Sequence, residues 1–219
     1  MIIVAIDETN YERASEVIES LDPKKCMVKI GSVAFNAIGH KIIRFAAEKG
    51  FEIFLDLKLH DIPNTVKKSI KGLLSLPIKM LTIHISGGKD MMKAAMEATS
   101  GTQIKVFGVT ALTSLNDDDT KFLYQRTTSE QVNAMLDLAE EVGIDGVVCS
   151  PHELELVSKR NLLVITPGIR LQKSNDDQKR VMTPREATDL GADYLVIGRP
   201  ITASKDIKKS LNEIYQSLI

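Results

Sequence analysis

The stretch FEIFLDLKLHDIPNTV, residues 51–66, contains the pattern that decides the fold. Its first half, Phe51 to Leu57, is almost wholly apolar and rich in aromatic and β-branched residues. That composition is typical of a strand buried on both faces in a parallel sheet. After Pro63 the chain enters a helical pattern, so the stretch predicts a buried strand, a short polar loop and a helix.

Three charged side chains stand where this strand ends. Asp56 and Lys58 occupy positions i and i+2, so a regular strand places them on the same face. Asp61 lies just beyond, in the connecting loop. Charges at the end of a buried strand cost desolvation energy unless they pair or take part in chemistry. The local pattern therefore leaves two interpretations open, a salt-bridged strand end and a catalytic site.

Apolar runs of strand length recur along the whole chain and alternate with helical patterns. The expected strands are Ile2–Ile6, Met27–Ile30, Ile53–Leu57, Lys79–Ile83, Lys105–Val109, Gly146–Cys149, Leu162–Ile165 and Tyr194–Ile197. The expected helices include Tyr11–Leu21, Ala37–Lys49, Val66–Leu76, Met91–Ala98, Glu130–Val142 and Arg185–Leu190. This alternation in 219 residues predicts a single (β/α)8 TIM barrel domain, residues 1–219, rather than a doubly wound open sheet. No GxGxxG follows the first strand, as a dinucleotide-binding open sheet would require.

Composition excludes several classes of function. A formal net charge of −1 gives no basic surface for nucleic acid or for an anionic membrane. The longest apolar runs are too short to span a bilayer. Cys26 and Cys149 each lie beside an apolar run and are expected to be buried free thiols, and the four histidines have no zinc-binding spacing. The sequence thus predicts a cytoplasmic protein that binds neither nucleic acid nor membrane.

In a (β/α)8 barrel the functional side chains lie at the carboxyl ends of the strands. This chain carries polar or turn-forming residues at many of these positions, and we expect them to form one rim. They are Asp7, Lys29, Asp56, Lys58, Asp61, Thr110, Thr113, Pro167, Gly168, Arg170, Gly198 and Arg199.

The segment YLVIGRPIT, residues 194–202, indicates a phosphate site. A buried strand ends in Gly198 and Arg199, and Pro200 can open a short helix. Glycine permits close backbone approach, a helix start offers free N–H groups, and arginine adds a forked cation. Loops after the seventh and eighth strands bind phosphate in many barrels. The long polar loop from Arg170 to Arg180 is expected to act as a lid.

Lys29 lies inside the apolar run VKIG, where a lysine is rarely buried without a partner. If the barrel closes, Lys29, Asp56 and Lys58 come from adjacent strands and form an alternating network of charges. A carboxylate at position 29 would have made a divalent-metal site with Asp56, and the lysine argues against a metal. The acidic run 117–119 is interpreted as the start of a helix, where acids are favoured by the helix dipole.

Taken together, these segments resemble the orotidine 5'-phosphate decarboxylase family. The resemblance rests on FLDLKLHDIPNTV, VAID, VKIG, VTALTS, TPGIR, VIGRP and the eight-residue step from Arg170 to Gln178. It runs from Asp7 to Arg199. The DxKxxD pattern alone is shared with a wider group of phosphate-sugar barrels, including hexulose-phosphate synthases. Those enzymes have a metal-binding glutamate where this chain has Lys29, so the lysine favours the decarboxylase.

The resemblance implies decarboxylation of orotidine 5'-phosphate to uridine 5'-phosphate and carbon dioxide, the last step of de novo UMP biosynthesis, with no metal and no cofactor. It implies a homodimer whose active sites are shared across the interface. The implied charged network consists of Lys29, Asp56, Lys58 and Asp61, with Asp61 reaching in from the neighbouring subunit and Lys58 protonating carbon 6. The implied substrate-binding residues are Asp7, Lys29, Ile62, Thr65, Thr113, Pro167, Arg170, Gln178, Gly198 and Arg199.

Two other functions remain open on the sequence. The first is an aldolase-type or epimerase barrel that acts on a sugar phosphate and needs a divalent metal. The second is a nucleotide-binding barrel without catalysis. The intact set of Asp56, Lys58 and Asp61 argues against the second.

Overall fold

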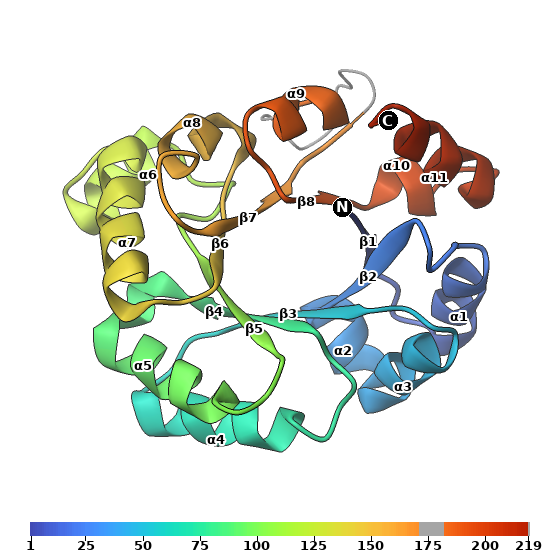
Figure 1. The fold of residues 1–219 in the computed structure, drawn as a ribbon, viewed down its shortest axis with the longest axis horizontal. Coiled ribbons are helices and arrows are strands. Elements are labelled where there is room, and N and C mark those ends of the chain that lie inside the picture. The colour runs from blue at the N-terminus through green and yellow to red at the C-terminus, as the bar shows by residue number, and fades with distance from the viewer. Residues whose placement is uncertain (171–181, 219) are drawn as a thin grey trace.

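The computed structural model describes residues 1–170 and 182–218, which form a barrel of parallel strands surrounded by helices (Figure 1). Each strand pairs with the next one along the chain, and the last pairs with the first, so the barrel is closed. The strands are β1 (Ile2–Ile6), β2 (Cys26–Gly31), β3 (Ile53–Leu59), β4 (Met80–His84), β5 (Lys105–Val109), β6 (Gly146–Val148), β7 (Leu163–Pro167) and β8 (Tyr194–Ile197). The predicted (β/α)8 TIM barrel is confirmed.

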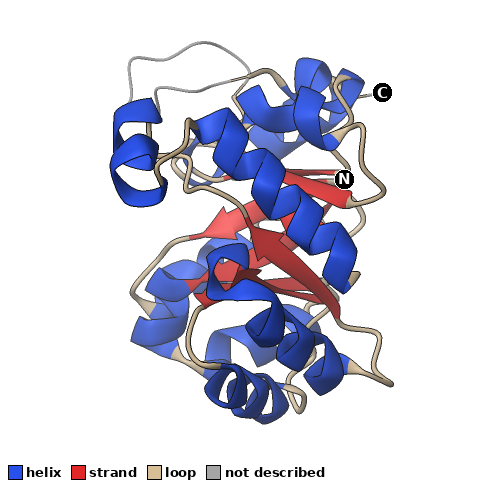
Figure 2. Ribbon diagram, turned by 90° about the vertical axis from the view of Figure 1, so that its left-hand side faces the viewer, coloured by secondary structure: helices blue, strands red, loops and turns tan. Residues whose placement is uncertain are grey.

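Helices cover the outside of the barrel (Figures 1 and 2). The α-helices are α1 (Tyr11–Glu19), α2 (Ser32–Ile38), α3 (His40–Glu48), α4 (Pro63–Leu73), α5 (Gly88–Thr99), α6 (Asp117–Tyr124), α7 (Thr128–Val142), α8 (Leu154–Val157), α9 (Pro184–Asp189), α10 (Arg199–Thr202) and α11 (Ile207–Gln216). Two 3-10 turns, η1 (Ile85–Gly87) and η2 (Pro151–Glu153), lie in the connections. In the part of the chain that the structure describes, every helix is too short or too polar to cross a membrane.

The prediction of one helix over Ala37–Lys49 is wrong. The segment belongs to two helices, α2 and α3, which are separated at Gly39. Gly39 has a φ of 74°, a conformation that glycine adopts readily and that ends α2. The apolar periodicity of α3 continued across this break in the sequence, which is why the pattern alone did not reveal it.

Side chains cap several helices at their first turn. Thr183 and Ser150 both form capping boxes, although the second begins the turn η2 rather than an α-helix. The acidic run 117–119 forms the first turn of α6, which Asn116 caps, so its interpretation as a helix start is confirmed.

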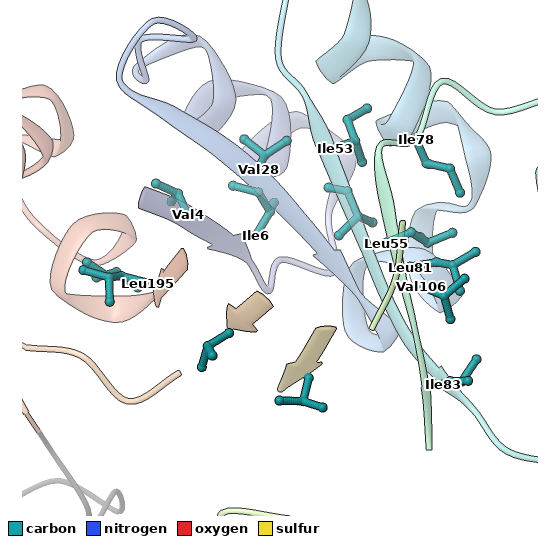
Figure 3. Close-up of a cluster of buried hydrophobic side chains, with 14 of the residues drawn as sticks. Val4, Ile6, Val28, Ile53, Leu55, Ile78, Leu81, Ile83, Val106 and Leu195 are labelled. Atoms are coloured by element: carbon teal, nitrogen blue, oxygen red, sulfur yellow. The ribbon is translucent and has the colours of Figure 1, made fainter. Parts of the chain in front are cut away.

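The hydrophobic core has two layers, one outside and one inside the barrel. The outer layer packs strand residues against the helices, and Figure 3 shows part of it, including Val4, Val28 and Leu55. The inner layer fills the barrel with Ile3, Ala5, Met27, Phe54, Met80, Phe107, Ile165 and Val196. Both cysteines are buried free thiols, as expected. Because the inner layer closes the barrel, polar side chains at the carboxyl ends of the strands stand on an apolar floor.

Candidate active site

The register of the first three strands places the charged residues at two adjacent levels of the barrel. Gly31 on β2 pairs with Asp56 on β3, and Asp7 directly follows β1, so these three positions lie at one height. Lys29 pairs with Ala5 and precedes Gly31 by two residues, so it lies one layer lower on the same face. The lysine side chain therefore has to rise past Gly31 to reach the two carboxylates.

The side chains of these strands form an alternating network of charges. The ammonium of Lys29 lies 3.3 Å from Oδ1 of Asp7 and 3.6 Å from Oδ2 of Asp56. The ammonium of Lys58 lies 2.7 Å from the same Oδ2 of Asp56. The predicted meeting of Lys29, Asp56 and Lys58 is confirmed. Two cations thus face one oxygen of a carboxylate that is 7% exposed.

Gly31 leaves the space through which Lys29 reaches the network. A Cβ atom placed on Gly31 would lie 2.8 Å from Nζ of Lys29 and 3.6 Å from Oδ1 of Asp7. The first distance is closer than nonbonded atoms approach, so the ammonium would have to move. Gly31 has a φ of −93°, which any residue can adopt, so the requirement for glycine comes from space and not from the backbone.

Substitution of Gly31→Ala is expected to displace the Lys29 ammonium without unfolding the barrel. We expect kcat/KM for the substrate to fall about 10- to 100-fold, the effect of losing one hydrogen bond to a charged group. The matched control is Gly72→Ala on the exposed face of α4, where an added Cβ meets nothing within 4 Å. Equal activity of Gly31→Ala and Gly72→Ala would contradict the role given to Gly31.

Asp56 is held as a carboxylate by its surroundings. Burial raises the pKa of Asp56, but the cations of Lys29 and Lys58 and the hydrogen bonds from Lys58 and Thr82 outweigh burial and lower the pKa below its ordinary value. The group is therefore ionised at neutral pH. A buried carboxylate between two ammonium groups is a fixed negative charge at the carboxyl end of β3.

The strand β3 is not regular where Asp56 and Lys58 lie. Leu55 pairs with Leu81 and Leu59 pairs with Ile83, so β3 has two more residues than β4 between these pairs. Lys58 has a φ of 51°, in the left-handed region that costs a side-chain-bearing residue roughly 1–2 kcal/mol. The two side chains meet as predicted, but through this bulge and not through a regular alternation. Strained backbone of this kind is concentrated at functional sites.

A cavity of about 310 Å³ opens above the charged network at the carboxyl ends of the strands. Its lining includes nine of the predicted site residues, namely Asp7, Lys29, Asp56, Lys58, Thr113, Pro167, Arg170, Gly198 and Arg199. Phe54, Val148 and Val196 contribute apolar surface to the same cavity. The cavity therefore combines an apolar floor, a charged wall and arginines, which suits a flat ring with an attached anionic group.

Three other predicted site residues are absent from the described lining of this cavity, and a fourth, Gln178, is not among the described residues. Asp61, Ile62 and Thr65 lie on the loop after β3 and the start of α4, and none of them is among the described residues that line the cavity. Ile62 is 67% exposed, and its N–H donates to Oδ1 of Asp61 at 2.7 Å. Gln178 and the predicted lid, residues 170–180, fall outside the described residues except for Arg170.

The structure also brings together residues that the sequence did not single out. Thr82 contacts both Asp56 and the backbone of Lys58. The rings of His60 and His84, distant in sequence, lie 5.2 Å apart beside the network. The pKa of His84 is lowered by burial and by the nearby His60 and Lys58. Strand pairing between β3 and β4 creates these contacts, and no spacing in the sequence signals them.

A metal site does not assemble in the residues that the structure describes. No group of three or more His, Cys, Asp or Glu side chains comes together in those ranges. At the network itself, Lys29 places an ammonium beside Asp56 and Asp7, in the position where a carboxylate-bound cation would otherwise lie. Electrostatic repulsion from this ammonium and from Lys58 disfavours a divalent cation there.

Comparison with known proteins gives the same family over nearly the whole chain. The model of the orotidine 5'-phosphate decarboxylase / HUMPS family matches residues 1–214. The chain is 46% identical over 226 residues to the orotidine 5'-phosphate decarboxylase of Coxiella burnetii, covering 99% of this chain and 96% of that protein. It is 44% identical over 220 residues to the orotidine 5'-phosphate decarboxylase of Saccharophagus degradans, covering 97% and 92% respectively.

Comparison with solved structures points to the same family as the sequence relatives. The crystal structure of orotidine 5'-phosphate decarboxylase from Lactobacillus acidophilus superposes with a TM-score of 0.86 and 34% identity, covering 99% of this chain and 98% of that one. The family match, the relatives and the shared barrel all span the charged network on β1 to β3. The chain belongs to the orotidine 5'-phosphate decarboxylase / HUMPS family.

Proposed function

We propose that this chain is an enzyme that decarboxylates orotidine 5'-phosphate to uridine 5'-phosphate and carbon dioxide, in the biosynthesis of pyrimidine nucleotides. The observation that carries the proposal is the network of Lys29, Asp56 and Lys58 in the wall of a cavity of about 310 Å³. Relatives with 44–46% sequence identity to this chain are named orotidine 5'-phosphate decarboxylase. The ammonium of Lys29 disfavours the alternative activity, a metal-dependent reaction on a sugar phosphate.

The chemical step uses side chains of the network. The bond between carbon 6 and the carboxylate breaks, its electron pair stays on carbon 6, and carbon dioxide leaves. The ammonium of Lys58 stabilises the developing carbanion and transfers one proton to carbon 6, which yields the product and a neutral lysine that solvent protonates again. A fixed cation favours the localised charge of the transition state over the spread charge of the substrate carboxylate.

Asp56 contributes in two ways to this mechanism. It accepts a hydrogen bond from Lys58 at 2.7 Å, which fixes the position of the ammonium at the wall of the cavity. Its negative charge also lies where the substrate carboxylate binds, and that repulsion disappears as neutral carbon dioxide forms. Both effects require Asp56 to be ionised, as its lowered pKa provides.

The rest of the substrate is held by the remaining residues of the cavity. Asp7 and Lys29 bind the ribose hydroxyls, and Thr113 and Pro167 contact the pyrimidine. The phosphate binds to Arg170, Gly198 and Arg199 at the ends of β7 and β8, with Gln178 as a further ligand. Binding energy from a phosphate remote from carbon 6 orients the base and raises the rate of the chemical step.

Substitution of Arg199→Ala is expected to lower kcat/KM for orotidine 5'-phosphate about 10²- to 10³-fold, because a forked pair of charge-assisted hydrogen bonds is lost. The loss should disappear when the substrate is orotidine, which has no phosphate. The control is Arg185→Ala on α9, whose guanidinium lies 4.0 Å from Asp189 at the surface and contributes little. Equal losses with and without the substrate phosphate would contradict the assignment of Arg199.

The proposal includes a homodimer located in the cytoplasm. Asp61, Ile62 and Thr65 belong to the family pattern but lie beside the cavity of their own chain, and Ile62 exposes an apolar side chain. A twofold dimer that packs this edge against the neighbouring barrel would bring the three residues to the partner's cavity. Apolar exposure at Ile62 supports such a contact.

Turnover of orotidine 5'-phosphate tests the proposed reaction. The loss of substrate absorbance should be matched by equal amounts of uridine 5'-phosphate and carbon dioxide. Tight binding of uridine 5'-phosphate without any turnover would instead support a binding protein. Activity on a hexulose phosphate, with none on the nucleotide, would assign the chain to the other branch of its family.

A further inference from the structure

Thr82 occupies a central place under the charged network and has no role assigned so far. It lies on β4, inside the barrel, and is 1% exposed. It is not part of the described cavity lining, so any effect on the cavity passes through its neighbours. Its hydroxyl lies between the carboxylate of Asp56 and the backbone of Lys58.

The directions of both hydrogen bonds of Thr82 are determined by their partners. The backbone N–H of Lys58 can only donate, so Oγ1 of Thr82 accepts from it at 2.9 Å. The hydroxyl proton is then free to donate to Oδ1 of Asp56, also at 2.9 Å. One side chain thus joins the backbone of the cationic residue to the carboxylate that faces it.

The first of these bonds satisfies a backbone group that the bulge removes from the sheet. Between Leu55 and Leu59 the ladder to β4 is interrupted, and Lys58 has its left-handed φ of 51° in this interval. A buried N–H without an acceptor is unfavourable. The hydroxyl of Thr82 takes the place of the missing carbonyl and so stabilises the backbone conformation that directs Lys58 into the cavity.

The second bond sets the rotation of the Asp56 carboxylate. With Oδ1 bound to Thr82, Oδ2 is the oxygen that faces Lys58 at 2.7 Å and Lys29 at 3.6 Å. Thr82 also adds to the lowering of the pKa of Asp56, after the larger contributions of Lys29 and Lys58 and against the effect of burial. Removal of the hydroxyl is therefore expected to loosen the carboxylate and to raise its pKa.

We infer that Thr82 is a positioning residue, which holds Asp56 and Lys58 in their reactive arrangement by bridging them with one hydroxyl group. The inference rests on the decarboxylase function proposed above. It concerns the rate of the chemical step and not the affinity for the substrate, because Thr82 touches the network from below and is shielded from the cavity by it.

The test compares Thr82→Val, which keeps the shape and removes the hydroxyl, with Thr82→Ser, which keeps the hydroxyl. We expect Thr82→Val to lower kcat about 10- to 100-fold, the effect of losing one hydrogen bond to a charged group, with KM changed less than about twofold. Thr82→Ser should recover kcat to within about threefold of the unsubstituted chain. The control is Thr99→Val on α5, a buried threonine whose hydroxyl contacts only backbone carbonyls.

A pH titration separates positioning from a general loss of stability. Because Thr82 lowers the pKa of Asp56, Thr82→Val should shift the acid limb of kcat to higher pH, and Thr82→Ser should not. The carboxyl carbon of Asp56, followed by NMR without substrate, should show the same shift. An unchanged kcat in Thr82→Val, or a loss equal in all three variants, overturns the inference while leaving the decarboxylase function intact.

Failure of the proposed function gives a different result. If the unsubstituted chain itself shows no turnover of orotidine 5'-phosphate, the decarboxylase function fails and the substrate-free titration decides on Thr82. An Asp56 pKa that is equal in the unsubstituted chain and in Thr82→Val then overturns the inference, and a raised pKa in the variant supports the bridge.

Discussion

Substitution of Lys58→Ala is expected to lower kcat for orotidine 5'-phosphate by about 10⁴-fold, the upper end of what a positioned general acid contributes. The effect is large because the same ammonium stabilises the developing charge and supplies the proton. Binding should change much less, since the phosphate and ribose contacts come from other strands. The dissociation constant for uridine 5'-phosphate, measured by calorimetry, is expected to stay within about tenfold of its original value.

Loss of Lys58 should not unfold the protein. Asp56 keeps Lys29 at 3.6 Å and the hydroxyl of Thr82 at 2.9 Å, so its charge remains paired. The matched control is Lys67→Ala on α4, a lysine that pairs with Glu97 at the surface. A folded Lys58→Ala variant with kcat near that of Lys67→Ala would contradict the assignment of Lys58 as proton donor.

The second large effect is expected when two inactive variants are combined in one dimer. Lys58→Ala and Asp61→Ala should each be nearly inactive as homodimers. In a hybrid dimer with shared sites, one site has both defects and the other has neither. If the two variant chains pair at random, about half of the dimers are hybrids. Each hybrid has one intact site out of two, so the mixture is expected to show about a quarter of the activity of the unsubstituted dimer.

Co-expression of the two variants with different affinity tags allows the hybrid to be isolated. A site built from one chain alone predicts no recovery, because each site of the hybrid would keep one defect. The position of Asp61 outside the cavity of its own chain favours recovery. Gel filtration of the same sample shows whether the dimer forms at all, so failed assembly is distinguished from an unshared site.

Much of this architecture follows from the sequence because the barrel is built from local patterns. Each strand is a short apolar run, and several helix starts carry a side-chain cap, such as Thr183 on α9 and Thr127 on α7. Polar residues at strand ends fall on one rim once the strands are parallel, so Lys29, Asp56 and Lys58 were expected to meet, and they do. The approach of Lys29 to Asp56 follows from strand order and period, whereas Lys58 reaches Asp56 through the bulge in β3.

The features that could not be predicted from the sequence depend on contacts between strands. The bulge at Lys58 arises from a mismatch in length between β3 and β4, which no single segment reveals. Nothing in the sequence around Thr82 distinguishes it from other buried threonines, and its contact with Asp56 is seen only in the folded barrel. Gly31 acts through the side chain of Lys29, two residues earlier, and only the packed barrel shows the space it leaves.

The most direct test of the account is the rate of orotidine 5'-phosphate decarboxylation by the unsubstituted chain after removal of all metal with EDTA. Full activity is expected in EDTA, with no gain from added Mg²⁺ and with one uridine 5'-phosphate formed for each carbon dioxide released. Activity that disappears with EDTA and returns with a divalent cation would contradict it, because the network of Lys29, Asp56 and Lys58 would then not be sufficient for the reaction.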